Sequence, residues 1–338
     1  MTVRVAVVCA MVILVSTPAL GLDIETVPVG NPGNAPDTRY EPNGVGGVDY
    51  AYSIGKFEIT AGQYAEFLNA VADTDLYWLY DTRMWSEYGC LIERTGSPNS
   101  YAYSAVPTLE DIPVNFVSWA SAARFCNWLE NGQPTGAQDL TTTEDGSYYL
   151  NGALSDYDLF AATRKEGARW VIPTADEWYK AAYHKNDGVT GNYFDYPTSS
   201  DSTPSNDWIN PDPGNNATFA DDDYTVDWPH QTPVGAHENS ESPYGTFDQG
   251  GNVFEWNETT FYDQARMYRG GAWSSPHGHM LSSYCRYSDH NTDAWDHTGF
   301  RVAYIPEPAT LALLAFGGLA LLRRRRTDKP HNPMSRSA

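Results

Sequence analysis

The stretch YGTFDQGGNVFEW, residues 244–256, decides the fold, because a polar turn with two adjacent glycines runs there directly into an aromatic strand. Gly250 and Gly251 can adopt backbone conformations that are closed to other residues, so they predict a tight turn. The stretches RMYRGGAW (266–273) and TGFRVAY (298–304) predict further short strands and tight turns. We therefore expect a β-rich region with much irregular backbone.

Upstream of this region, three helices are each predicted by a capping residue followed by an apolar face. Thr60, Ser118 and Thr174 are the expected caps, and Thr174 forms a capping box with Glu177. Gly132 is expected to end the second helix. The faces that we expect to be buried comprise Tyr64, Phe67, Leu68 and Val71 in the first helix and Ala122, Phe125, Cys126 and Leu129 in the second.

The remaining segments divide into strand-like and loop-like composition. Residues 48–60 alternate and are rich in aromatic side chains, which predicts a strand, whereas residues 23–38 predict a loop or an edge strand. Residues 76–112 are polar and predict surface loops. Residues 186–232 predict a loop of unusual length, which usually needs pinning, often by a metal. With 41% hydrophobic residues, the chain can build a core, and we expect a single α+β domain over residues 22–304.

Both ends of the chain have the composition of targeting segments. Residues 1–21 combine Arg4, a short apolar run and small residues, which predicts a secretory signal peptide; a membrane anchor is the alternative. Residues 305–326 contain Pro306, Glu307 and Pro308, then an apolar stretch, then four arginines. This order predicts a stop at the inner membrane, with the arginines in the cytoplasm and the bulk of the chain exported. Residues 327–338 form a short polar tail.

The exported part is strongly acidic. The whole chain has 21 basic and 43 acidic side chains; one basic residue lies in 1–21, and six basic and two acidic residues lie in 305–338. The segment between therefore has 14 basic and 41 acidic side chains, a net charge of −27. Nucleic-acid binding is excluded on this ground, since phosphate contacts need clustered Lys and Arg.

Three cysteines remain once Cys9 leaves with the signal peptide. Cys90, Cys126 and Cys285 allow either one disulfide and one free thiol or three buried thiols. Cys126 lies on the apolar face of the second predicted helix, which indicates a thiol in the core rather than a nucleophile. Their spacing matches neither a CxxC motif nor a zinc site.

Six segments in order resemble the formylglycine-generating enzyme, or sulfatase-modifying-factor, family. They are KFEITAGQYAEFLNAV, PVNFVSWASAARFCNWL, RWVIPTADEWYKAAY, YGTFDQGGNVFEWNE, YRGGAW and GFRVA, and they extend along almost the whole exported region. The resemblance implies an irregular, C-type-lectin-like α+β fold with little regular secondary structure and with bound calcium. It also implies an oxidation of a sulfatase cysteine to formylglycine, performed with oxygen by a copper-bound cysteine pair.

This sequence departs from the family at that cysteine pair. Counting from Gly271, the two family positions are Ser275 and Met280, and Ala272 stands where the family has a serine. Soft thiolates select Cu(I), whereas a serine hydroxyl is neither soft nor redox-active. We therefore expect no catalytic residue at these positions and no formylglycine formation by the family mechanism.

The resemblance also implies two calcium sites. The first would take carboxylates from Asp248 and Glu255 and backbone carbonyls from Gly251 and Val253. Hard oxygen ligands from a tight loop suit Ca²⁺, and a hydrogen-bonded turn with a buried acid is the alternative. The ligands of the second would be Asn216, the Ala217 carbonyl and Asp227, in a loop whose length differs from the family's.

Two histidines lie where the family keeps its redox centre. His277 and His279 would project to the same side of an extended backbone, and imidazole binds copper and iron. A substituted transition-metal site is one hypothesis, and a polar loop that lines a cleft is the other. Four further residues are expected to build the core around this cleft: Arg269, Trp273, Arg286 and Arg301.

The C-terminal segment resembles the PEP-CTERM sorting signal of bacteria that have an outer membrane. The match comprises Pro306, Glu307 and Pro308, the apolar stretch and the arginines. The resemblance implies recognition by an exosortase, with a membrane-held intermediate and delivery to the cell surface or extracellular matrix.

Three functions follow from these observations. The first is a non-catalytic, calcium-stabilised binding module at the cell surface, with extracellular polysaccharide or a surface protein as its partner. The second is a metal-dependent oxidoreductase that uses the histidine-containing loop. The third is formylglycine generation itself.

Overall fold

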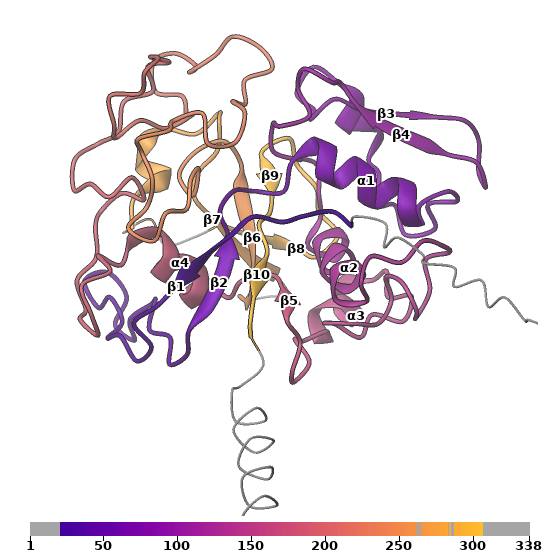
Figure 1. Ribbon diagram of the computed structural model, residues 1–338, viewed down its shortest axis with the longest axis horizontal. Coiled ribbons are helices and arrows are strands. Elements are labelled where there is room, and N and C mark those ends of the chain that lie inside the picture. The colour runs from indigo at the N-terminus through magenta and orange to yellow at the C-terminus, as the bar shows by residue number, and fades with distance from the viewer. Residues whose placement is uncertain (1–20, 262–264, 283, 285–286, 307–338) are drawn as a thin grey trace, which may run out of the picture.

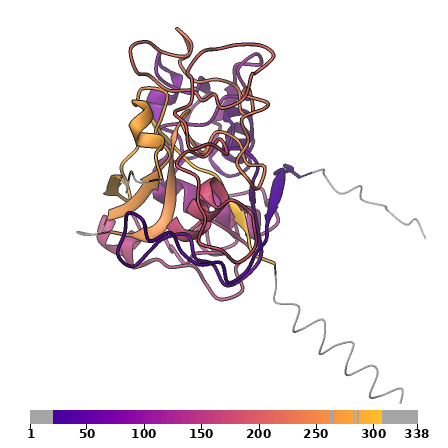
Figure 2. The same ribbon diagram turned by 90° about the vertical axis from the view of Figure 1, so that its left-hand side faces the viewer.

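The computed structural model describes residues 21–261, 265–282, 284 and 287–306. Two four-stranded sheets form its centre, with helices on either side of them (Figures 1 and 2). The first sheet has the order β1-β2-β10-β5 and is antiparallel throughout. Its strands are β1 (Thr26–Val29), β2 (Tyr52–Gly55), β10 (Ala303–Tyr304) and β5 (Trp170–Val171). β1 lies at an edge, as expected for residues 23–38, and β2 is shorter than the strand predicted over 48–60.

The second sheet has the order β8-β7-β6-β9, in which β6 pairs with β9 in parallel. Its strands are β8 (Tyr287–His290), β7 (Ala265–Arg269), β6 (Phe254–Thr260) and β9 (Thr298–Gly299). The turn before β6 was predicted from its glycines, and Gly251 has φ 92°. A Cβ atom on Gly251 would lie 2.2 Å from the Thr218 carbonyl oxygen, so the close approach of these two segments requires glycine here.

The three predicted helices are confirmed, with their caps. They are α1 (Ala61–Val71), α2 (Trp119–Glu130) and α4 (Ala175–Tyr183). The Thr60, Ser118 and Thr174 side chains each accept from a backbone N–H of the first turn, and the capping box of Thr174 with Glu177 is present. A fourth helix, α3 (Asp156–Ala161), was not predicted, because six residues are too few to establish a helical period.

The segment predicted as surface loops contains regular structure. Within residues 76–112 lie the 3₁₀ helix η1 (Thr82–Trp85) and a hairpin of β3 (Ile92–Thr95) with β4 (Ala102–Ala105). The loop prediction was therefore wrong for this hairpin, whose strands are only four residues long. Residues 186–232, by contrast, contain only isolated bridges and no helix or strand, as predicted.

The main core lies between α1 and α2, on the right of Figure 1. Phe67 and Phe125 meet edge to face with ring centroids 5.2 Å apart, and Trp128 packs against both. Phe300, which follows β9, packs on Phe125 at 5.3 Å. The segment after β9 thus packs onto α2, and the sheet that carries the glycine-rich turn is anchored to this core.

Candidate functional site

The segment after Gly270 and Gly271 is the one where the resemblance implies a redox centre. Ser275 is buried and lies in a tight turn, in which its N–H donates to the Ala272 carbonyl at 2.8 Å. The Ser275 Oγ accepts from the Ala272 N–H at 3.1 Å. The hydroxyl therefore closes a turn.

Met280 lies at the other family position and is fully buried. It packs in a small apolar cluster with Tyr196, Ala217 and Phe219. Its backbone carbonyl accepts from the Tyr183 hydroxyl at 2.9 Å. The thioether thus contributes packing between the long loop 186–232 and the glycine-rich turn.

The two histidines of this segment have different surroundings. His277–Met280 forms the 3₁₀ helix η3 rather than extended backbone, so the condition under which His277 and His279 would share a face is not met. The His277 Nδ1 lies 2.7 Å from Asp221 Oδ2 at the surface. The His279 ring stacks on Tyr284 at 4.4 Å, and burial lowers the pKa of His279. Over the described ranges, no group of three His, Cys, Asp or Glu side chains is placed to hold a metal ion.

Beside this segment, four rings from three distant parts of the chain form a cluster. Trp273 stacks on His230 at 4.8 Å and on Tyr88 at 6.0 Å, with interplanar angles of 11° and 6°. Tyr224 packs against both Trp273 and His230. Trp273 is buried, whereas Tyr88 and Tyr224 are each 46% exposed. We call Tyr88, Tyr224, His230 and Trp273 the aromatic cluster; it presents two tyrosine rings to solvent over a buried tryptophan.

The first predicted calcium site lies in a buried ion-pair network around Arg301. Arg301 Nε is 2.6 Å from Glu255 Oε2, and Arg301 Nη2 is 2.7 Å from Glu255 Oε1. Trp178 Nε1 also donates to Glu255 Oε2, at 2.7 Å. Both carboxylate oxygens of Glu255 are thus engaged by a guanidinium that a calcium ion would repel. The residues as they lie do not fit a calcium ion that has Glu255 as a ligand.

The other proposed ligands of that site lie in the glycine-rich turn. Asp248 is half-buried, and its Oδ2 accepts from the Gly235 N–H at 2.6 Å. Gly251 donates its N–H to the Gly270 carbonyl, and Val253 is fully buried one residue before β6. Burial, opposed by the Gly235 hydrogen bond, raises the pKa of Asp248.

The proposed ligands of the second calcium site differ in exposure. Asn216 and Ala217 are buried, whereas Asp227 is exposed. The Asn216 N–H donates to Ser240 Oγ at 2.8 Å, and its amide donates to the Asp207 carbonyl at 2.9 Å. A cavity of about 10 Å³, room for roughly one water molecule, brings Asn216 together with His237 and Asp248 instead. Calcium at the second site stays a prediction, and at the first site it would need ligands other than Glu255.

The loop 186–232 is held by hydrogen bonds that sequence reasoning did not anticipate. Asp212 accepts from the Gly214 and Asn239 N–H groups and from Ser240 Oγ, at 2.8–3.0 Å. These hydrogen bonds lower the pKa of Asp212 against the opposing effect of its burial. Asn, Asp and Ser are the residues whose side chains bond to nearby backbone, which is the signal that could have indicated this arrangement.

Cys90 and Cys126 are buried free thiols, as predicted for Cys126. Burial raises the pKa of Cys90 to about 12 and that of Cys126 well above its usual value. Neither can supply a reactive thiolate at neutral pH. Cys285 and Arg286 lie outside the described residues.

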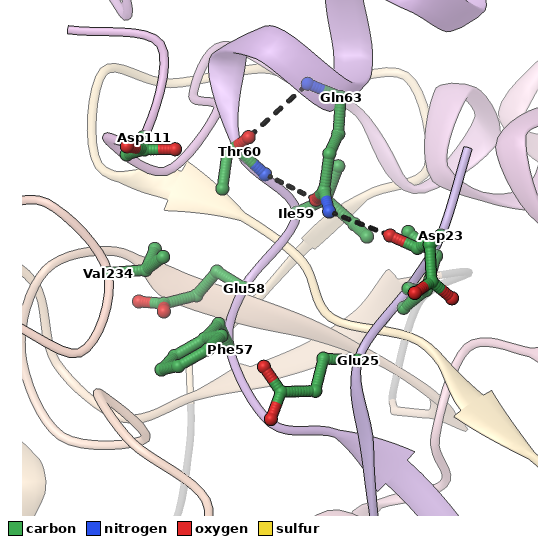
Figure 3. A pocket seen from close by; sticks show the side chains of 10 residues that line it. Asp23, Glu25, Phe57, Glu58, Ile59, Thr60, Gln63, Asp111 and Val234 are labelled. Carbon is green, nitrogen blue, oxygen red and sulfur yellow. Dashed lines mark hydrogen bonds between the residues drawn. The ribbon is translucent and has the colours of Figure 1, made fainter.

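The residue that sequence reasoning missed most clearly is Glu58. It lines a cavity of about 360 Å³ between β1 and α1 (Figure 3) and is itself 2% exposed. Its burial has no periodic signal in the sequence, because β2 ends at Gly55 and the adjacent Glu58 and Ile59 are both buried. Burial and the nearby Asp248 raise the pKa of Glu58 well above its usual value.

Comparison with protein families matches residues 27–305 to the sulfatase-modifying factor enzyme 1-like domain and residues 305–326 to the PEP-CTERM protein-sorting motif. The solved structure of CarF has the same fold, with a TM-score of 0.52 and 18% identity over 85% of this chain and 100% of CarF. Treponema denticola variable protein 1 (TM-score 0.48, 18% identity, 84% and 96% of the two chains) and PvdO from Pseudomonas aeruginosa (0.41, 18%, 84% and 93%) are also similar. Curated sequences gave no significant match.

Fold and site define an irregular α+β domain of the formylglycine-generating type, followed by a sorting signal. The chain belongs to the sulfatase-modifying factor enzyme 1-like family. The sorting motif indicates export and surface sorting through the membrane, and it implies recognition by an exosortase-type enzyme.

The targeting segments themselves lie largely outside the described residues. This holds for residues 1–20, for Glu307 and Pro308 and for the apolar stretch after them, whereas Pro306 is the last described residue. Between residues 21 and 306, no helix in the described part is long and apolar enough to cross a membrane.

Proposed function

We propose that this protein is an exported, non-catalytic binding module whose aromatic cluster takes an uncharged extracellular polysaccharide. The observation that carries the proposal is the placement of Tyr88 and Tyr224 at the surface over Trp273, two residues beyond the glycine pair. Aromatic rings present a large, rigid and partly apolar face, which suits the C–H face of a sugar ring. Calcium is left out of this proposal, because Glu255 is engaged by Arg301.

The non-catalytic part rests on Ser275 and Met280. At the positions that the resemblance assigns to the thiol pair, one side chain closes a turn and the other fills an apolar cluster. A hydroxyl is not a soft ligand, and a single buried thioether, although soft, is not a redox-active thiol pair.

The net charge of the domain favours uncharged polysaccharides over anionic ones. The segment between the two targeting regions carries a net charge of −27, so its surface repels polyanions. An uncharged glycan carries no such cost and offers hydroxyl groups to the carboxylates and amides of the neighbouring loops. The expected partner is therefore a neutral polymer.

Affinity electrophoresis of the full-length chain in detergent tests the proposal. Neutral dextran is the first probe, and the anionic polymer alginate is the comparison. We expect dextran to retard the chain and alginate not to. Removing both exposed rings (Tyr88→Ala with Tyr224→Ala) should weaken binding roughly tenfold, since one ring contact contributes about 0.5–1.5 kcal/mol.

Tyr157→Ala is the matched control, because Tyr157 on α3 is 71% exposed and lies outside the aromatic cluster. Equal loss in the control and the double variant would refute the assignment of the site, and retardation by alginate alone would refute the choice of a neutral polymer. Stoichiometric copper or iron in the purified chain, accompanied by oxygen consumption, would replace the proposal with an oxidoreductase.

A further inference from the structure

His277 and Asp221 form a dyad at the surface beside the aromatic cluster. The Asp221 Oδ2 lies 2.7 Å from the His277 Nδ1, and the Asp221 Oδ1 accepts from the His277 backbone N–H at 3.0 Å. Each oxygen of one carboxylate thus engages a different group of the same histidine. This double contact fixes the imidazole ring against the loop 186–232, although the two residues are 56 positions apart in the chain.

Both side chains of the dyad are open to solvent. The His277 side chain is 41% exposed and the Asp221 side chain is 38% exposed. The imidazole packs edge to face with the buried ring of Phe219, with centroids 6.5 Å apart. Within the described part of the chain, the His277 Nε2 has no hydrogen-bond partner, and it is not a buried atom. This nitrogen is therefore the atom of the dyad that a ligand can reach.

The carboxylate decides which nitrogen of the ring carries the proton. Burial raises the pKa of Asp221, but the hydrogen bonds from His277 outweigh it and hold the pKa below its usual value. An ionised carboxylate only accepts hydrogen bonds, so the His277 Nδ1 must be the donor. In the neutral ring, the Nε2 then has a lone pair and no proton, and it acts as an acceptor.

The dyad and the aromatic cluster are built from the same two segments of the chain. The Ala220 N–H donates to the Ser275 carbonyl at 2.9 Å, so residues 220–224 and 273–277 lie side by side. Members of the dyad and of the cluster are present in both segments. The first segment carries Asp221 and Tyr224, and the second carries Trp273 and His277.

The two sites are close enough for one polymer to touch both. His277 follows Trp273 by four residues, so their Cα atoms are at most about 14 Å apart even on a fully extended backbone. Tyr224, one of the exposed rings, packs on Trp273 with centroids 5.7 Å apart. A glycan chain that stacks on the cluster therefore extends to the His277 Nε2 within its neighbouring sugar units.

A sugar hydroxyl is the donor that suits this acceptor. Neutral glycans present C–H groups on the faces of their rings, which stack on aromatic side chains, and hydroxyl groups at the ring edges. An aromatic cluster takes the face of a sugar, and a fixed acceptor beside the cluster takes the edge of the same sugar or of the next one.

We propose that the His277 Nε2 accepts a hydrogen bond from a hydroxyl group of the glycan that stacks on the aromatic cluster, and that Asp221 is the positioning residue that holds the ring in this tautomer. The inference rests on the proposed function and deepens it. It names His277 as the residue that selects a glycan with a free hydroxyl at this point over one in which the hydroxyl is substituted.

Affinity electrophoresis of the full-length chain in detergent tests the binding role, with dextran and O-methylated dextran as probes. His277→Phe keeps a ring against Phe219 and removes the Nε2, and we expect it to weaken dextran binding about fivefold, the effect of one hydrogen bond. Methylated dextran should bind His277→Phe and the unchanged chain equally. The matched control is His290→Phe, because His290 is 55% exposed, lies 3.7 Å from Asp156 and is outside the aromatic cluster.

Nitrogen-15 NMR of the histidine side chains tests the positioning role. The neutral His277 ring should carry its proton on Nδ1, and a short dextran oligomer should shift the Nε2 signal of His277 but not that of His290. Asp221→Asn can still accept from the backbone N–H, but its amide would donate to the Nδ1, so the proton should move to Nε2. A carboxylate that only capped the backbone would leave the tautomer unchanged. The oligomer shift carries the test if His277→Phe does not fold.

The proposal is overturned if His277→Phe binds dextran as tightly as the unchanged chain, if methylated dextran shows the same loss, or if the proton lies on Nε2 in the neutral ring. Each of these outcomes leaves dextran binding by the aromatic cluster in place. A chain that binds no dextran at all overturns this proposal together with the proposed function, so the two failures are distinguishable.

Discussion

The loss of stability on replacing Arg301 by methionine follows directly from the contacts of its guanidinium. The guanidinium makes two hydrogen bonds to Glu255 at 2.6 and 2.7 Å, and it donates to the Gly55 and Phe247 carbonyls at 2.9 and 2.8 Å. Arg301→Met keeps an unbranched apolar stem and leaves Glu255 buried without its charged partner. Breaking one half of a buried pair costs about 3–5 kcal/mol, and we expect a loss of this size.

The loss should be measured by chemical denaturation of the full-length chain, followed by tryptophan fluorescence. Lys165→Met is the matched control, because Lys165 is 40% exposed and pairs with Asp145 at the surface, where a pair contributes about 0–1 kcal/mol. Adding Glu255→Gln to Arg301→Met should recover part of the stability, since no buried charge is then left without a partner. Equal losses for Arg301→Met and Lys165→Met would refute the reasoning.

Three further predictions concern the backbone at Gly251, the pH dependence of thermal stability and the reactivity of two cysteines. Gly251→Ala should destabilise the domain by more than about 2 kcal/mol, because the added Cβ would lie 2.2 Å from a carbonyl oxygen. Gly167→Ala is the control: space around Gly167 is open, so this variant should cost only the left-handed backbone strain of about 1 kcal/mol. Burial lowers the pKa of His184 below its usual 6.5, so the unfolded state binds a proton more readily than the folded state. The melting temperature should therefore fall as the pH drops below about 6.5, and His184→Gln should make it depend less on pH. Cys90 and Cys126 should resist iodoacetamide in the native chain and react after denaturation, as read by mass spectrometry; labelling of either under native conditions would contradict their burial.

The helices and the glycine-rich turn could be predicted because their signals are local. Thr60 and Thr174 each cap a helix through the backbone three residues away, and Gly251 is required by one close contact. The hairpin of β3 and β4 escaped prediction, because polar side chains such as Glu93 and Arg94 mask its alternation. The hairpin lies against α1, where the Asn69 amide exchanges two hydrogen bonds with the Tyr103 backbone, and the sequence does not display this contact.

The candidate sites were harder to predict, because their members come together only through the tertiary fold. Tyr88, Tyr224 and Trp273 are far apart in the chain, and no periodicity connects them. Glu255 was predicted as a calcium ligand from the sequence around it alone. In the structure its charged partner is Arg301, which lies between β9 and β10. Local sequence identifies a carboxylate that needs a positive partner, but it does not reveal which cation supplies it.

The surroundings of Ser275 and Met280 bear on whether this segment forms a reactive centre or part of the core. A reactive centre must keep its side chains accessible, and a packed core must not, so the same two positions cannot serve both purposes. Here Met280 packs between the loop 186–232 and Gly250 of the glycine-rich turn, and Ser275 accepts a hydrogen bond that closes the separate turn Ala272–Ser275. Both contacts fix the segment that carries Trp273. In the proposed glycan binding, a rigid base of this kind would lower the entropy lost at Tyr88 and Tyr224, because their supporting ring is already in place.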